Sequence, residues 1–263
     1  MQEKFVKLWK TEIHYKMFED ENSLQDVLIL HWWWGKSDSW TQVWELLYQK
    51  AMRVIVPDLP WFWKTKITKN YTLEDYAQLI EDFCKQLELK NIILWWHSNG
   101  GAISITLENR WNIEIERLVL NNSAGIRKDE KRSLKRKIFN SVAKVVKKLI
   151  ETTGLLSLQK WWKLRNLFYR AIWWQDYLEA EKNPFLKQTY LNMIGSDLQE
   201  KIKQINTDTL LIWWEKDTYT PLSDAHLMRN AIKKSKLVVL DNETHWIHLK
   251  NPQRLVETFI DNI

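Results

Sequence analysis

The strongest constraint on this chain is a strand–turn–helix pattern at residues 92–109. An apolar run over residues 92–96 predicts a buried strand, Ser98 follows it, and residues 100–109 begin with two glycines and predict a helix. Such a turn pushes a serine side chain out of the sheet. It also places the next backbone N–H, that of Asn99, at a helix N-terminus, where it can stabilise an oxyanion. The pattern therefore predicts a nucleophilic serine, with an ordinary turn that happens to contain serine as the alternative.

Strand and helix signals alternate on both sides of this pattern. Apolar or alternating runs predict further strands at residues 12–18, 27–30, 53–57, 117–120, 210–214 and 237–240. Amphipathic stretches predict helices at residues 40–48, at 73–87 after the N-cap Thr72, at 223–232, and from Pro252 onward. Residues 126–206 show helical periodicity without strand signals. We predict an α/β fold with a mostly parallel, doubly wound sheet, a core of residues 1–125 and 207–263, and a helical cap inserted at 126–206.

Length and composition indicate the number of domains and the cellular compartment. A chain of 263 residues with a formal net charge of +6 suits one domain. The single cysteine, Cys84, excludes an internal disulfide and favours a reducing compartment. The charged N-terminal residues lack the apolar core of a signal peptide, and no apolar run approaches the roughly 20 residues that span a bilayer. We expect a cytoplasmic protein.

Side chains suited to nucleophilic catalysis follow the ends of three predicted strands. Ser98, Asp217 and His245 each follow a predicted strand, and ligands of parallel sheets bind at these carboxyl ends. His245 would take the proton of the weakly nucleophilic Ser98 hydroxyl, and Asp217 would orient the imidazole. Asp58 and Asp224 are rival acids, which we assign instead to a turn and to a helix cap.

The order Ser, Asp, His and its surroundings resemble the α/β-hydrolase fold family over essentially the whole chain. The family's loop, elbow and triad motifs correspond here to HWWWG at 31–35, DLPWFWK at 58–64, WHSNG at 96–100, LIWWEKD at 211–217 and HWIHLKNP at 245–252. The resemblance implies an oxyanion hole made by the backbone N–H groups of Trp33 and Asn99.

The resemblance also implies a reaction. We expect hydrolysis, through an acyl-Ser98 intermediate, of carboxylic esters of small or medium hydrophobic acids. Hydrolysis of carbon–carbon bonds in diketone-like acids and amide or peptide hydrolysis remain alternatives. Serine at position 98 argues against dehalogenase and epoxide hydrolase chemistry, which use a carboxylate nucleophile.

Tryptophan replaces the family's glycines systematically. At an average frequency of about 7 %, a chain of this length would contain about 18 glycines, but this one has 6 Gly and 18 Trp. Trp9 and Trp111 also occupy positions that suit a turn glycine. The substituted family positions are Trp32, Trp34, Trp61, Trp63, Trp96 and Trp214.

Tryptophan side chains at so many positions that suit glycine would cost more free energy than the roughly 5–15 kcal/mol by which a typical domain is stable. Some bacteria read the UGA codon as glycine and others read it as tryptophan, so translation with the wrong table would produce this pattern. We predict that these tryptophans are glycines of the natural protein, whereas Trp40, Trp44, Trp213 and Trp246 are true tryptophans. In the alternative every tryptophan is real, the site is blocked, and the chain is a non-catalytic binding protein.

Other ligands find less support in the sequence. Residues 126–148 form a basic amphipathic stretch with ten Lys or Arg, which we interpret as a solvated cap helix rather than a membrane-surface contact. No nucleic-acid motif accompanies this charge. The histidines lack metal-ligand spacing and no glycine-rich phosphate loop is present, so we expect no metal and no cofactor. The expected partner is a small acyl substrate, and the sequence does not indicate an oligomeric state.

Overall fold

The computed structural model describes residues 1–19, 23–31, 33–66, 69–98, 100–110, 112–126, 145, 148, 152, 175–217, 219–243 and 245–263. Within these ranges the chain forms an eight-stranded sheet in the order β1-β2-β4-β3-β5-β6-β7-β8. The strands are β1 (Gln2–Leu8), β2 (Thr11–Phe18), β3 (Gln25–Leu30), β4 (Met52–Pro57), β5 (Ile92–His97), β6 (Ile115–Asn121), β7 (Asp208–Trp214) and β8 (Ser235–Leu240).

The sheet is antiparallel at one edge and parallel elsewhere. β1 pairs with β2 and β2 with β4 in antiparallel fashion, and every pairing from β4 through β8 is parallel. The carboxyl ends of β5, β6, β7 and β8 therefore meet at one edge. This confirms the predicted mostly parallel, doubly wound sheet.

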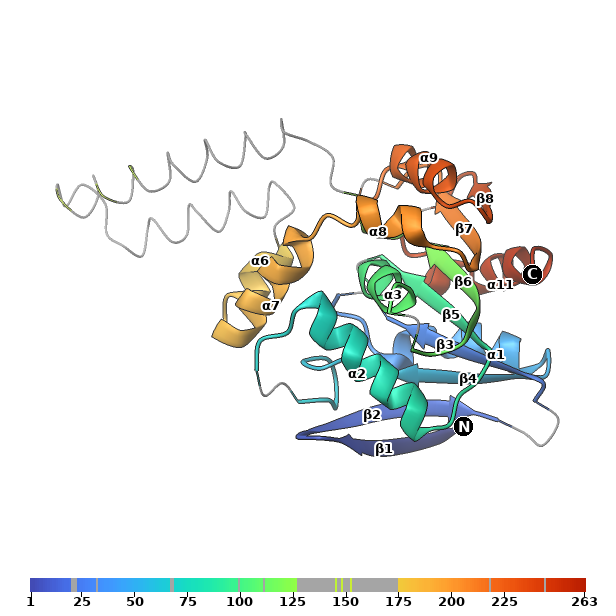
Figure 1. Ribbon diagram of the computed structural model, residues 1–263, viewed down its shortest axis with the longest axis horizontal. Coiled ribbons are helices and arrows are strands. Elements are labelled where there is room, and N and C mark those ends of the chain that lie inside the picture. The colour runs from blue at the N-terminus through green and yellow to red at the C-terminus, as the bar shows by residue number, and fades with distance from the viewer. Residues whose placement is uncertain are drawn as a thin grey trace.

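Helices cover both faces of the sheet (Figure 1). The helices of the core are α1 (Thr41–Tyr48), α2 (Leu73–Gln86), α3 (Gly100–Glu108), α9 (Leu222–Ala231), α10 (Ile247–Lys250) and α11 (Pro252–Ile260), with a short 3₁₀ helix, η1 (Ser37–Trp40), before α1. Successive strand residues point to opposite faces. Trp95 accordingly packs with the α1 and α11 layer, and Trp96 with the α2 and α3 layer.

Among the described residues between β6 and β7, three further helices are present: α6 (Gln175–Ala180), α7 (Pro184–Gly195) and α8 (Gln199–Gln204). Asn183 caps α7 by accepting hydrogen bonds from the N–H groups of Phe185 and Leu186. Tyr71 and Thr189 join α7 to the core, because the Tyr71 N–H donates to Thr189 Oγ1 at 2.8 Å. The predicted basic stretch, 126–148, falls on residues of which only 126, 145 and 148 are described.

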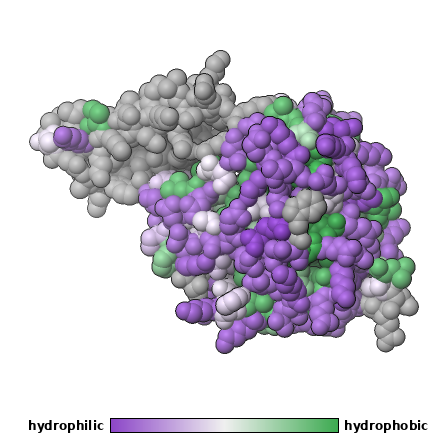
Figure 2. All heavy atoms as spheres, viewed as in Figure 1, coloured by the Kyte–Doolittle hydropathy of each residue, from purple (hydrophilic) through white to green (hydrophobic). Residues whose placement is uncertain are grey.

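The face of the molecule shown in Figure 2 is largely hydrophilic, with scattered apolar residues. Among the described residues, no helix combines the length and the apolar character that crossing a bilayer requires.

The structure adds to and corrects the element predictions. The N-cap Thr72 is confirmed, and Asp75 completes a capping box with it. The prediction missed β1, a largely exposed edge strand that carries Glu3, Lys4 and Lys7. The predicted cap role of Asp224 is wrong: Pro221 is the N-cap of α9, and Asp224 lies within its first turn.

Candidate active site

Ser98 lies at the turn between β5 and α3 in a strained conformation. Its φ is 58°, in the left-handed region that a residue with a side chain rarely adopts. The Ser98 N–H donates to the Asn121 carbonyl at 3.0 Å. The Ser98 carbonyl accepts from the N–H groups of Gly101 at 3.0 Å and Ala124 at 2.9 Å. These bonds hold the turn between α3 and the end of β6 and stabilise its strained backbone.

Asp217, after β7, contacts the imidazole of His245, after β8. The Nδ1 atom of His245 lies 2.5 Å from Asp217 Oδ2, and both residues are buried. The N–H groups of Tyr219 and Thr220 donate to Asp217 Oδ1 at 2.7 and 3.0 Å. A carboxylate held by several donors is fixed in orientation, and it fixes the ring that it contacts.

Asn122 is a residue of this site that the sequence analysis missed. Its side-chain amide donates to Asp217 Oδ2, and its Oδ1 accepts from the Trp214 N–H at 3.2 Å. Asn122 thereby joins the end of β6 to β7 and to the carboxylate. The polar residues after β6 were a visible signal, but nothing in the sequence connected them to Asp217.

His245 lies beside the serine turn. The ring centroids of His245 and His97, the residue before Ser98, are 4.5 Å apart, and His97 packs on His248 at 4.8 Å. Burial, together with His245 and His248, lowers the pKa of His97 well below its usual value. Burial, with a smaller contribution from His245, lowers the pKa of His248 to about 3. Both rings are therefore neutral neighbours of His245 near neutral pH.

The rival acid Asp58 belongs to a different contact. Asp58 Oδ2 lies 2.5 Å from Nδ1 of His14, and Asp58 Oδ1 accepts from the Ser37 N–H at 2.6 Å. His31 Nε2 in turn accepts from the Leu59 N–H at 3.0 Å. These bonds tie the loop after β3 to the end of β4. The structure thus pairs Asp217, and not Asp58, with His245.

Trp33, a predicted oxyanion-hole residue, lies in this loop and is buried, whereas its predicted partner Asn99 is outside the described residues. The Trp33 ring packs on Phe62 and on Tyr190 of α7, with centroids 5.2 Å away in each case. Trp33, Phe62, Gly100 and Met193 line a small, mostly apolar hollow.

Tyr219 and Asp176 are two further polar residues of this region. The ring of Tyr219 lies 4.9 Å from that of His245. Burial raises the pKa of Asp176, on α6, against the opposing effects of a hydrogen bond from the Trp34 indole and of His245. Neither residue carried a sequence signal, because each depends on how distant segments pack.

The sequence profile of the alpha/beta hydrolase fold family matches residues 27–252. The chain belongs to the α/β-hydrolase family. This membership confirms the resemblance on which the triad assignment was based.

Individual hydrolases are similar to this chain along most of its length. "Uncharacterized hydrolase YugF" of Bacillus subtilis is 23 % identical, covering 95 % of this chain and 94 % of that protein. A "2-hydroxy-6-oxo-2,4-heptadienoate hydrolase" of Pseudomonas putida is 26 % identical, covering 79 % and 78 %. The crystal structure of an esterase from Exiguobacterium antarcticum superposes with a TM-score of 0.72 at 21 % identity, covering 98 % of this chain and 97 % of that one.

We predict that Asn122→Ala lowers the free energy of unfolding by about 1.5–3 kcal/mol, because it removes a buried hydrogen bond to a charged group. Neighbouring Asn121 is the matched control: it is fully buried, and its side-chain amide has no hydrogen-bond partner among the described residues. Asn121→Ala should therefore be less destabilising. Urea unfolding of both variants measures the difference, and equal losses would contradict the role of Asn122.

We also predict that His248→Phe makes stability less sensitive to acid. The folded-state pKa of about 3 lies below the ordinary value, so protons bind the unfolded chain first as the pH falls. His248 therefore favours unfolding increasingly between about pH 6.5 and pH 3. Urea unfolding at several pH values should give a shallower decline for His248→Phe, and an unchanged slope for His226→Phe, which alters an exposed residue on α9.

Proposed function

We propose that the protein is a serine hydrolase that cleaves carboxylic esters of small or medium hydrophobic acids through an acyl-enzyme. The observation that carries the proposal is the buried contact between His245 Nδ1 and Asp217 Oδ2. The imidazole ring of His245 also lies against His97, the residue before Ser98. The strained φ of Ser98 supports it, because strain of this kind is typical of functional turns.

In this reaction the Ser98 hydroxyl attacks the ester carbonyl while His245 takes its proton. Because Nδ1 of His245 faces Asp217, Nε2 is the nitrogen that acts as the base. The resulting oxyanion would be stabilised by the backbone N–H groups of Trp33 and Asn99. His245 then returns the proton to the leaving alcohol, and a water molecule hydrolyses the acyl-Ser98 bond by the same route in reverse.

The acyl group would bind in the hollow beside Trp33. Its lining is mostly apolar, and Met193 of α7 contributes to it. This contact supports the proposal that residues 126–206 form a cap over a core of residues 1–125 and 207–263. A cap helix that lines the hollow would select the acyl chain by its length and shape.

The alternative of carbon–carbon bond hydrolysis rests on one comparison. The Pseudomonas relative is named as a hydrolase of an oxo-dienoate, an acid that carries a ketone. A carboxylate-bearing substrate would favour a basic pocket, whereas the described polar groups near His245 include the acidic Asp176. The ester assignment is therefore the better supported one.

The test is labelling by a fluorophosphonate probe combined with hydrolysis of p-nitrophenyl butyrate, in protein expressed in its native host. We expect labelling that is lost in Ser98→Ala and retained in Ser223→Ala, a control on α9. Asp217→Asn should lower kcat on the order of 10⁴-fold, because the imidazole loses its orienting partner. A folded native protein that neither reacts with the probe nor hydrolyses the ester would refute the proposal. Faster hydrolysis of an oxo-dienoate than of the ester would favour the alternative.

A further inference from the structure

In the described part of the chain, four tryptophans occupy backbone conformations that normally require glycine. The φ angles of Trp9, Trp34, Trp61 and Trp63 are 54°, 67°, 86° and 52°. A bulky residue at positive φ is a genuine outlier, whereas Asn91, Asn122 and Asn242, which share this region, belong to a type that tolerates it. Trp40 and Trp246, which the sequence predicts to be true tryptophans, differ because their φ angles are negative, at −106° and −109°.

Trp9 shows that a catalytic role does not explain this strain. It lies with Lys10 in the two-residue turn between β1 and β2, where Leu8 pairs with Thr11. Trp9 has a positive φ and Lys10 does not, which is the pattern of a type II′ turn, whose first central position takes glycine. This hairpin forms an edge of the sheet, and Trp9 is 85 % exposed.

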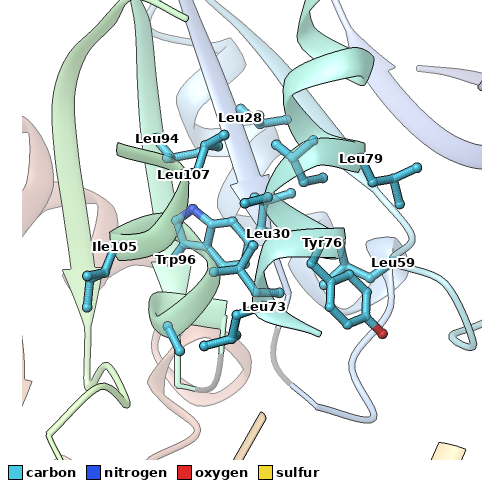
Figure 3. Close-up of a cluster of buried hydrophobic side chains, with 14 of the residues drawn as sticks. Leu28, Leu30, Leu59, Leu73, Tyr76, Leu79, Leu94, Trp96, Ile105 and Leu107 are labelled. Carbon is cyan, nitrogen blue, oxygen red and sulfur yellow. The ribbon is translucent and has the colours of Figure 1, made fainter. Parts of the chain in front are cut away.

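Trp96 is crowded in a different way. A methyl carbon added to Gly100 would lie 2.2 Å from Cε3 of Trp96, so the indole occupies the space directly against the start of α3. Figure 3 shows the ring among apolar side chains that include Leu30, Ile105 and Leu107. β5 and α3 meet at this point, where a glycine would let the two backbones approach closely.

We propose that glycine stands at positions 9, 34, 61, 63 and 96 in the protein made by its source organism, through a codon that is read there as glycine. The backbone angles and the closeness of Trp96 to Gly100 are observations separate from the glycine deficit. They fall at four of the substituted family positions, 34, 61, 63 and 96, and at Trp9. The proposal does not require the protein to be a hydrolase.

One consequence rests on the proposed function. The Trp34 ring lies 6.0 Å from the rings of Trp33 and of Phe62, which line the hollow, and its indole donates to Asp176 of α6. The Trp34 side chain therefore occupies the space between the hollow and α6. Glycine at position 34 would enlarge the hollow on that side and remove the hydrogen bond to Asp176.

Peptide masses decide the proposal. Trypsin releases residues 54–64, which contain positions 61 and 63, and residues 37–50, which contain Trp40 and Trp44. For protein isolated from the source organism, we expect the first peptide to have the mass for glycine at both positions and the control peptide to retain both tryptophans. Tryptophan at 61 and 63 would overturn the proposal whether or not the protein has hydrolase activity.

A second test measures the melting temperature of variants made in the protein that has tryptophan at all of these positions. We expect Trp9→Gly to raise the melting temperature by about 2–4 °C over Trp9→Ala, because only glycine adopts this φ without strain. Both variants lose the Trp9 hydrogen bond to Asp82, so that bond cancels in the comparison. Trp40→Gly, at a buried position with negative φ, should lower the melting temperature. An alanine variant as stable as the glycine variant would remove the argument from the backbone.

Discussion

The turn at Ser98 is the constraint on which the rest of the site depends. Its N–H donates to β6 and its carbonyl accepts from Gly101 and Ala124, so the sheet and α3 hold a serine at positive φ from both sides. Because the turn is fixed to Asn121 at the end of β6, the position of Ser98 is tied to the residue directly before Asn122. The strained backbone at Ser98 and the positions of Asn122 and Asp217 are therefore parts of one hydrogen-bonded arrangement.

Polar side chains from separate segments of the chain meet at the carboxyl edge of the sheet. Asn122 follows β6, Asp217 follows β7 and His245 follows β8, and the parallel register places these ends beside one another. Hydrogen bonds from Asn122, Tyr219 and Thr220 converge on Asp217, which leaves His245 with a fixed partner. A second histidine–carboxylate contact joins His14 of β2 to Asp58 after β4, and Asp58 also accepts a hydrogen bond from Ser37 in the loop after β3.

The tryptophans explain part of what sequence reasoning missed. The β1–β2 hairpin went unrecognised partly because its charged strand faces solvent and partly because Trp9 hides the turn signal that glycine would have provided. The loops at Trp34, Trp61 and Trp63 are likewise built for small residues at positive φ. In each case the fold retains the backbone that a glycine would require, although the side chain contradicts it.

The sequence by itself determined the alternation of strands and helices, the order of Ser98, Asp217 and His245, and the membership of a family built on that order. These features are local, because periodicity and motif spacing are properties of short segments. Only the tertiary structure decided which aspartate meets which histidine, that Asn122 supports Asp217, and that Tyr219 and α7 lie at the site. Such contacts depend on strand register and helix packing between residues far apart in the chain, and no local pattern encodes them.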